Sequence, residues 1–439
     1  MAIDTIGTNA IANDAVTAAK IPAGAVDADI TAIPDGSVTT AKLAADAVTA
    51  AKLADNSVVT ANVTDGAITQ VKTTGVGRGR NLIINGAMHV AQRDNASGVT
   101  AHTYAGPDRM RLLLDSGGTY SISQNTDVPT GQGFYHSYKL NCTSAVAFGG
   151  AGDNVHLRMG SLESRDCQQF AYGTSNAKKL TLSFWIKVQY ADTFNAALVN
   201  HDAQRSNFRP FTISSANTWQ KVTLTYDGDT NSGDGFNDDG GLGLSVDLWL
   251  GSGSNFTGGS ATANNWDERA NNNTSLVAAS TKFGTSTNHE LYITGIQLEL
   301  GDQATDFDHR LISETLQLCQ RYYMEFNPNN AAYDFICLSY GLDSDDIIGV
   351  INLPCAMRAS PTLTSSNLEI FIGSGGGTDT ADQAIVGYSL VGPSNQSSLK
   401  TSLPFNIDTD GSPSITAGYC YPVGFRSESS GYLRLNAEF

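Results

Sequence analysis

The chain has 439 residues, enough for two to four domains at roughly 100–200 residues each, and its formal net charge is −17. Its few lysines and arginines form no cluster, which argues against binding to a nucleic-acid backbone. It also lacks the run of about 18 apolar residues that a membrane span requires. Every Phe, Tyr and Trp lies at or beyond Tyr104, so the first quarter lacks the side chains that supply much of an ordinary core.

Residues 1–80 repeat a short unit that Asp and Gly punctuate. Aliphatic residues recur at intervals of 10, 12, 10, 10 and 10, at Val16, Val26, Val38, Val48, Val58 and Ile68. One such unit buries too little apolar area to offset the entropy of ordering its backbone. A ten-residue period does not fit a coiled coil, so we expect extended pieces ordered between three intertwined chains, as a slender shaft. The alternative is a disordered linker rich in Ala and Thr.

Residues 81–310 carry the pattern of an antiparallel β-sandwich. Runs rich in aromatic and β-branched residues are separated by Asn, Gly and Ser, which is typical of strands. In the run from Leu180 to Tyr190, apolar and polar residues alternate, which predicts one buried face. The remaining expected strands are Thr119–Gln124, Tyr135–Cys142, Trp219–Tyr226, Gly243–Leu250 and Leu291–Leu300. Strands at this spacing without helix-period segments predict a jelly roll.

A short helix and a further β-domain complete the predicted organisation, which is mostly β. The apolar spacing predicts a helix over Ser313–Phe326, within a linking segment 311–326, with Ser313 as its cap. Its apolar seam either docks on the neighbouring sandwich or meets other copies on a trimer axis. Residues 327–439 again alternate like strands, and we expect a second β-sandwich there, at the tip of the molecule.

Five residues are candidates for contact with a sugar, because sugar rings present both C–H patches and hydroxyls. Trp266 stands among polar residues, with Asp267 and Arg269 beside it. Its alternative role is that of a loop anchor tucked under the sandwich. Tyr340, with Asp343 nearby, is the candidate in the C-terminal domain. Trp185 lies on the otherwise polar face of its strand, so we expect it to be exposed or at a subunit contact.

Signals for catalysis and for metal binding are weak. The sequence has no His-Glu-x-x-His or Gly-x-Ser-x-Gly motif, so we expect no enzyme activity and no cofactor. Asp227, Asp229 and Asn231 resemble the start of a calcium loop, but Ser232 stands where that loop needs Gly. We therefore expect a polar hairpin connection there and no metal site. The six cysteines lack metal-ligand spacing, and we expect them to be buried free thiols.

Three motifs resemble those of bacteriophage tail fibres and prophage tail proteins. They are Asn81-Leu-Ile-Ile-Asn-Gly-Ala-Met-His-Val-Ala-Gln-Arg93, Thr294-Gly-Ile-Gln-Leu-Glu-Leu-Gly301 with Ala304-Thr-Asp-Phe-Asp308, and Glu314-Thr-Leu-Gln-Leu-Cys-Gln-Arg-Tyr-Tyr323. Asp108-Arg109 matches a shorter motif of that family, and the N-terminal units resemble the Val-Thr-x-x-Lys-Leu repeats of fibre shafts. The run from Met357 to Thr362 resembles the terminal domain of such fibres. The family's jelly roll is similar to carbohydrate-binding modules.

This resemblance implies a homotrimeric tail fibre in the virion tail, made in the cytoplasm of the host bacterium. The opening residues also lack the basic and apolar regions of a signal peptide. The N-terminal end would attach to other tail or baseplate proteins, and the other domains would adhere to a glycan on the host cell surface. Two alternatives stay open: a structural adaptor that holds another receptor-binding protein, and a polysaccharide depolymerase.

Overall fold

The structure is a computed structural model that describes residues 48–49, 79–115, 118–257, 262–269, 283–328, 333–344, 346–371, 383–390, 402–409, 415–426 and 431–439. The chain divides into Met1–Ile68 and Thr69–Phe439. Apart from Val48 and Thr49, the repeats of the predicted shaft lie outside the described residues, and the shaft stays a prediction. Within the described ranges, no helix has both the length and the apolar character needed to cross a bilayer.

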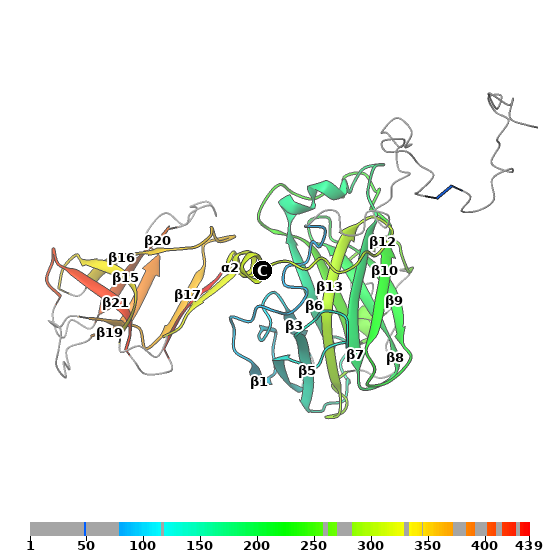
Figure 1. The fold of residues 1–439 in the computed structure, drawn as a ribbon, viewed down its shortest axis with the longest axis horizontal. Coiled ribbons are helices and arrows are strands. Elements are labelled where there is room, and N and C mark those ends of the chain that lie inside the picture. Colours follow the sequence, from blue (N-terminus) through cyan, green and yellow to red (C-terminus); the bar gives the residue numbers. More distant parts are fainter. Residues whose placement is uncertain are drawn as a thin grey trace, which may run out of the picture. The chain divides into compact units, whose positions relative to one another are not determined.

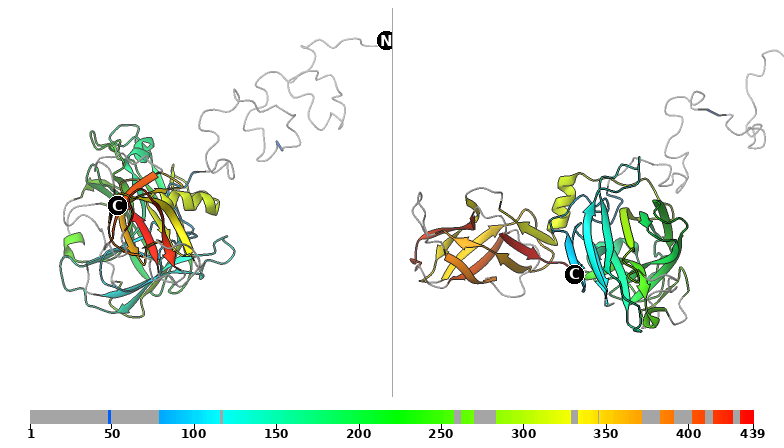
Figure 2. Two further views of the ribbon diagram at one scale, coloured as in Figure 1. Left: turned by 90° about the vertical axis from the view of Figure 1, so that its left-hand side faces the viewer. Right: turned by 90° about the horizontal axis from the view of Figure 1, so that it is seen from below.

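Two antiparallel sheets form the first β-domain (Figures 1 and 2). The six-stranded sheet has the order β1 (Ala96–Val99), β4 (Thr119–Asn125), β5 (Ser137–Ser144), β13 (Glu290–Leu300), β7 (Leu180–Val188) and β10 (Gln220–Tyr226). The seven-stranded sheet has the order β12 (Trp266–Glu268), β9 (Arg205–Ile213), β8 (Asp192–Asn200), β11 (Leu242–Ser252), β6 (Asn154–Glu163), β3 (Arg111–Leu114) and β2 (Thr103–Tyr104). The paired strands of both sheets run antiparallel, which confirms the predicted sandwich.

The core lies between the two sheets, where the alternation along β7 directs every second side chain. Leu180, Leu182, Phe184, Ile186 and Val188 are fully buried, whereas the residues between them face outward from the six-stranded sheet. Rings cross the space between the sheets, for example Phe184 against Phe211 with centroids 5.5 Å apart. Such interdigitated aromatic contacts contribute more than their buried area alone.

The motif residues hold loops in place. Gln297 and Glu299 follow a bulge in β13 and face outward, opposite Ser183 and Thr181 of β7. The Glu299 carboxylate accepts hydrogen bonds from the N–H (2.9 Å) and hydroxyl (2.7 Å) of Thr305. The Asn81 side chain bonds the backbone of β13 through Ile296 O (2.9 Å) and Leu298 N (3.1 Å). These buried polar groups are therefore satisfied by the loops that they fix.

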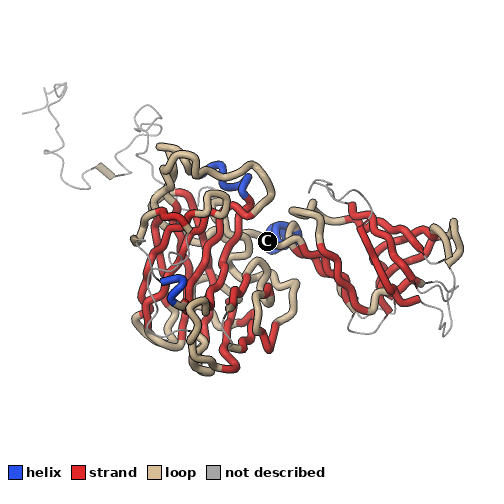
Figure 3. Tube along the Cα trace, turned by 180° about the vertical axis from the view of Figure 1, so that it is seen from behind, coloured by secondary structure: helices blue, strands red, loops and turns tan. Residues whose placement is uncertain are grey.

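Three helical segments occur in the described residues, all short (Figure 3). They are the 3-10 segment η7 (Ser164–Phe170), α1 (Ser254–Thr257) and α2 (Ile312–Gln320). The predicted helix over Ser313–Phe326 is wrong at both ends. Leu311 occupies the cap position with no side-chain bond, and the chain leaves the helix after Gln320, because its next residues pair as a strand with the end of the chain.

The C-terminal part is a small sheet joined to a barrel, where a second sandwich was expected. The three-stranded sheet has the order β14 (Tyr323–Phe326), β22 (Tyr432–Asn436) and β17 (Thr362–Ser366). The closed barrel has the order β15 (Tyr333–Gly341), β16 (Asp346–Asn352), β20 (Ser402–Thr409), β19 (Gln383–Leu390), β18 (Glu369–Ile370) and β21 (Cys420–Arg426). Closure pairs the edge strands that a sandwich would leave open.

A buried ionic cluster joins this C-terminal part to the sandwich. Glu163, at the end of β6, is 1% exposed and accepts bonds from Arg321 Nε (2.6 Å), Arg321 Nη2 (2.7 Å) and the Tyr322 hydroxyl (2.9 Å). Arg321 and Tyr322 belong to the Cys-Gln-Arg-Tyr-Tyr motif. Because a buried carboxylate requires charged and hydrogen-bonding partners, this motif fixes the point where α2 gives way to β14.

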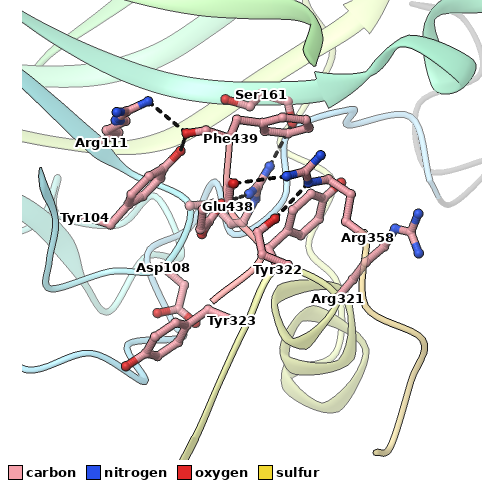
Figure 4. Close-up of polar contacts among 12 residues, drawn as sticks. Tyr104, Asp108, Arg111, Ser161, Arg321, Tyr322, Tyr323, Arg358, Glu438 and Phe439 are labelled. Carbon is pink, nitrogen blue, oxygen red and sulfur yellow. Dashed lines mark hydrogen bonds and ion pairs between the residues drawn. The ribbon is translucent and has the colours of Figure 1, made fainter. Parts of the chain in front are cut away.

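A second set of contacts surrounds the Arg109 guanidinium, whose partners Ser161, Tyr322 and Glu438 are labelled in Figure 4. It forms an ion pair with Glu438, donates to Ser161 O (2.9 Å) and lies 3.4 Å from the centroid of the Tyr322 ring. Burial alone would lower the pKa of Arg109, but the Glu438 carboxylate raises it. Arg358 donates to Glu438 O (3.0 Å). The buried ion pair thereby links Arg109 of the Asp-Arg motif to Glu438, which follows the last strand, β22.

Candidate functional site

A hollow of about 240 Å³ lies on the outer face of the six-stranded sheet. Trp185 of β7 stands in it and is partly exposed. Its lining comprises Gly131, Gln132, Phe134, Ser183, Trp185, Lys221, Gly295, Thr305, Asp306, Phe307 and His309. The hollow is thus formed by β7, β10 and β13 together with the loops that precede β5 and follow β13.

The floor of the hollow follows from strand register and from one glycine. Lys221 of β10 lies directly opposite Trp185, so both side chains leave the same face of the sheet. Gly295 sits at the bulge of β13 with φ of 63°. A Cβ there would lie 2.6 Å from the Phe134 ring. Glycine therefore both permits the left-handed backbone and lets Phe134 close over the strand.

Three aromatic rings form one wall. Phe134 contacts Phe307 and His309 with centroids 5.0 and 5.5 Å apart. The loop that carries Phe307 and His309 is held at Thr305 by Glu299 and at Asp308, whose N–H donates to Gln297 Oε1 (2.8 Å). The wall is therefore positioned before any ligand binds, which lowers the entropy cost of binding.

The chemistry of the hollow suits a sugar ring. Trp185 supplies an aromatic face for C–H groups, and Lys221, Gln132 and Asp306 supply exposed donors and acceptors around it. Its volume is slightly below the roughly 300–1,000 Å³ typical of pockets for drug-sized ligands, which fits one sugar residue. It would accept the end or a side branch of a glycan rather than a long segment.

The neighbouring aromatic rings on the same face are already occupied. Lys187 Nζ lies 4.3 Å from the Tyr292 ring centroid and 5.7 Å from that of Trp219. Asp127 accepts hydrogen bonds from Lys187 and from Trp219 Nε1. Partial burial would raise the pKa of Asp127, but these bonds outweigh it and lower that pKa. Trp185 is therefore the indole on this face whose ring lines the hollow.

The predicted sugar contact at Trp266 lies in a different environment. Trp266 is on β12 and only 6% exposed. Its Nε1 donates to Asp227 O (2.7 Å), and its ring packs edge-on against Tyr172 with centroids 5.3 Å apart. Trp266 thus lies where a buried anchor would lie, which is the alternative role given for it above. Asp267 accepts from Asn265 Nδ2 (3.1 Å), and Arg269 Nη1 lies 3.3 Å from His201 Nδ1.

The predicted sugar contacts lie in two different places. Trp266, Asp267 and Arg269 are in or beside β12 of the sandwich, whereas Tyr340 and Asp343 are in the C-terminal barrel. Tyr340 and Asp343 belong to the C-terminal barrel, at the end of β15 and in the hairpin that follows it. Tyr340 is 47% exposed. Asp343 Oδ1 accepts the Asp346 N–H (2.8 Å), which is a turn-stabilising bond. Their contact with a glycan stays a prediction.

The residues of the calcium-like loop are engaged by cations of the protein itself. Asp229 is 2% exposed and pairs with Arg205 Nε at 2.7 Å, and Asp234 pairs with the same nitrogen at 3.0 Å. Asp227 pairs with Lys179 Nζ at 2.8 Å. Asn231 donates to Asp234. Arg205 thus pairs with Asp229 and Asp234, and Lys179 pairs with Asp227.

Sequence reasoning singled out Trp185 but missed the rest of the hollow. Phe134, Lys221 and the Asp306–His309 loop come from three separate segments, and nothing in their local pattern links them. The available signal was Gly295, a glycine within a strand pattern, which indicates a bulge or a close approach. The cysteine expectation was partly wrong: Cys142, Cys167 and Cys319 are buried, Cys337 and Cys355 are partly exposed, and Cys420 is exposed.

Several solved structures are similar to part of this chain. A putative sugar binding protein from Bacteroides thetaiotaomicron is 13% identical, with 50% of this chain and 99% of that chain covered and a TM-score of 0.25. A family 11 carbohydrate-binding module from Clostridium thermocellum, in complex with a β-1,3-1,4-mixed-linked tetrasaccharide, is 9% identical over 48% and 97%, with a TM-score of 0.24. The enzymatically active domain of tailspike protein 4 of bacteriophage CBA120 is 13% identical over 44% and 19%, with a TM-score of 0.23.

The match to the tailspike spans only about a fifth of that protein's domain, at 19%. No protein-family model matches the sequence. No curated protein matches it either. The functional assignment therefore depends on the geometry of the hollow and on the sequence motifs, and not on these likenesses.

Proposed function

We propose that the sandwich domain binds a glycan through the Trp185 hollow, and that the chain acts as a homotrimeric tail-fibre protein that adheres to a host bacterial surface. The observation that carries the proposal is a partly exposed indole in a preformed hollow with exposed polar side chains around it. The motif resemblance supports the role in a virion tail. The role proposed is adhesion without catalysis.

The charge of the chain bears on how such a contact would form. At a net charge of −17, the protein would gain little long-range attraction to a bacterial surface, which is also mostly anionic. Recognition would depend on short-range stacking and hydrogen bonds. Three copies would then raise the overall affinity of individually weak sites by multivalency.

Binding to purified host-surface polysaccharide tests this proposal. The Trp185→Ala variant of the full chain should bind at least roughly tenfold more weakly, since the loss of about 1.4 kcal/mol of stacking and burial produces that change. Tyr135→Ala is the matched control, because Tyr135 is 75% exposed and does not line the hollow. Equal binding by wild type and Trp185→Ala would refute the assignment of the site. Shortening of the polysaccharide during incubation would contradict the non-enzymatic role.

A further inference from the structure

The strands of the six-stranded sheet carry three lysines, and they differ in their acidic partners. Lys139 Nζ pairs with Glu290 at 2.8 Å, and Lys187 pairs with Asp127. Lys221 is exposed, and within the part of the chain that the structure describes its side chain forms no ion pair. The lysine without an acidic partner is thus the one that lines the Trp185 hollow.

Strand register fixes where this cation stands relative to the indole. Lys221 of β10 lies directly opposite Trp185 of β7, and Trp185 lies opposite Thr294 of β13. Neighbouring strands are only about 4.8 Å apart, and lysine has a long, flexible side chain. The Lys221 ammonium can therefore reach the edge of a sugar ring that is stacked on Trp185, on the side of β10.

The side of the hollow toward β13 has a different chemistry. Phe134 closes over Gly295 of β13, and its ring contacts that of Phe307. Phenyl rings accept C–H groups but donate no hydrogen bond, so a charged substituent placed against them would lose its water without gaining a partner. A charged group on a stacked sugar would therefore be stabilised on the side of Lys221.

Asp306 is the carboxylate that lines the hollow, and it belongs to the side of β13. Its backbone oxygen accepts a hydrogen bond from Gln297 Nε2 of β13 (3.3 Å), and Phe307 of the wall follows it in the chain. A carboxylate accepts hydrogen bonds from sugar hydroxyls and repels an anion. Asp306 thus favours hydroxyls at its own end of the hollow, and its charge is not neutralised by an ion pair with Lys221.

We propose that the Trp185 hollow selects a sugar residue with an anionic substituent, a carboxylate or a phosphate, and that this anion pairs with Lys221. The inference rests on the proposed function, since it names the class of sugar that the same site takes. Hydrogen bonds between an ammonium and an anion are stronger than those between neutral groups. In a chain with a net charge of −17, Lys221 would supply the local contact with an anionic glycan that long-range attraction does not supply.

Removing the charges of the glycan tests this inference. Binding of the full chain to purified host-surface polysaccharide is compared with binding to two treated samples of it. In one sample the carboxylates have been reduced to alcohols, and in the other the phosphates have been removed. Wild type should bind one of the treated samples about fivefold more weakly than the native polysaccharide, as the loss of a partly exposed ion pair implies. The sample that binds more weakly identifies the anion as a carboxylate or a phosphate.

Variants of the lysine show whether the preference belongs to the hollow. Lys221→Met keeps much of the apolar stem and removes the cation, so it should bind the native polysaccharide about fivefold more weakly and no longer distinguish it from the treated samples. Lys221→Arg should keep the preference. Lys178→Met is the matched control, because it changes the net charge equally at an exposed lysine that does not line the hollow. It should bind every sample like wild type.

Two results would overturn this inference and leave the proposed function standing. One is equal binding of wild type to the native and both treated polysaccharides, and the other is a preference for the native form that survives in Lys221→Met. In both cases, weaker binding by Trp185→Ala would still assign the glycan to the hollow. If Trp185→Ala binds like wild type, the proposed site and this inference both fail. Thermal unfolding checks that each variant folds; because Lys221 is exposed, Lys221→Met should unfold at the temperature of wild type.

Discussion

The ion pair between Arg321 and Glu163, which joins the C-terminal part to the sandwich at what is here termed the junction, gives a specific prediction about stability. The Arg321→Met substitution removes two hydrogen bonds of 2.6 and 2.7 Å and leaves the Glu163 carboxylate buried. Breaking a fully buried pair from one side costs about 3–5 kcal/mol. The Arg321 side chain is 24% exposed and Arg165 Nε lies 3.5 Å from the same carboxylate, so solvent and a second cation reduce the loss. We expect the free energy of unfolding to fall by about 2–3 kcal/mol.

The distribution of tryptophans provides the assay. All four tryptophans of the chain lie between Trp185 and Trp266, so their fluorescence reports on the sandwich alone, whereas far-UV circular dichroism reports on every β-domain. Because a chain with several folded parts need not unfold in one step, denaturant midpoints from the two probes are compared. In Arg321→Met, the C-terminal part loses its ion pair with Glu163 of the sandwich. It should therefore unfold at a lower denaturant concentration, so the dichroism midpoint should fall below the fluorescence midpoint.

The double variant Arg321→Met, Glu163→Gln is the control. A neutral amide costs less to bury than an unpaired carboxylate, so the double variant should regain part of the lost stability. The reasoning is refuted if Arg321→Met shifts both midpoints by less than the equivalent of about 0.5 kcal/mol, the range of ordinary surface substitutions. It is also refuted if the double variant is less stable than Arg321→Met.

Three further predictions concern the sandwich. Trp266→Phe removes the bond to Asp227 O (2.7 Å) and part of a buried ring, and should destabilise the protein by about 2–3 kcal/mol in denaturant unfolding without weakening glycan binding. Gly295→Ala should cost more than Gly98→Ala in thermal unfolding and should weaken glycan binding, because both glycines have positive φ but only Gly295 has a ring within contact of the added Cβ. Burial raises the pKa of Asp108 to about 6 from 3.8, despite Arg93 and Gln92; its stabilising contribution is therefore full at acid pH and lost as pH rises through about 6. Between pH values equal to these two pKa values, Asp108→Asn should reduce the fall of the free energy of unfolding with pH. Urea unfolding at several pH values across that range measures this fall. An unchanged slope of unfolding free energy against pH would contradict the argument.

The sandwich could be predicted where its strands have one buried and one polar face. The alternation from Leu180 to Val188 is of this kind, and these residues form the core as expected. β8 was missed because its outward residues are apolar too: Ala197 and Val199 pack with Phe208 in a second cluster. A strand that is covered on both faces loses the period-2 signal.

The end of α2 and the composition of the hollow depend on contacts between distant segments. The helical spacing continues through Tyr323, but β22 offers that residue a partner, Asn436, more than a hundred residues later. Tertiary pairing therefore overrides the local pattern. Similarly, the motifs that carry the resemblance define structure: Glu299 holds a loop, and Arg321 with Tyr322 holds the junction. Gly295, Thr305, Asp306 and Phe307 of the same motifs also line the hollow.

The path of the chain through the three-stranded sheet has a mechanical consequence. The chain runs from β14 into the barrel at β15, returns at β17, enters again at β18 and returns at β22. Four connections thus link the barrel to one small sheet, and β22 lies between the other two strands. A single tether would act as a hinge, whereas four crossings divide any pull or twist on the barrel among several strands. Force applied at the barrel would therefore pass through this sheet toward the ionic contacts that Arg321 and Glu438, which flank it in sequence, make with the sandwich.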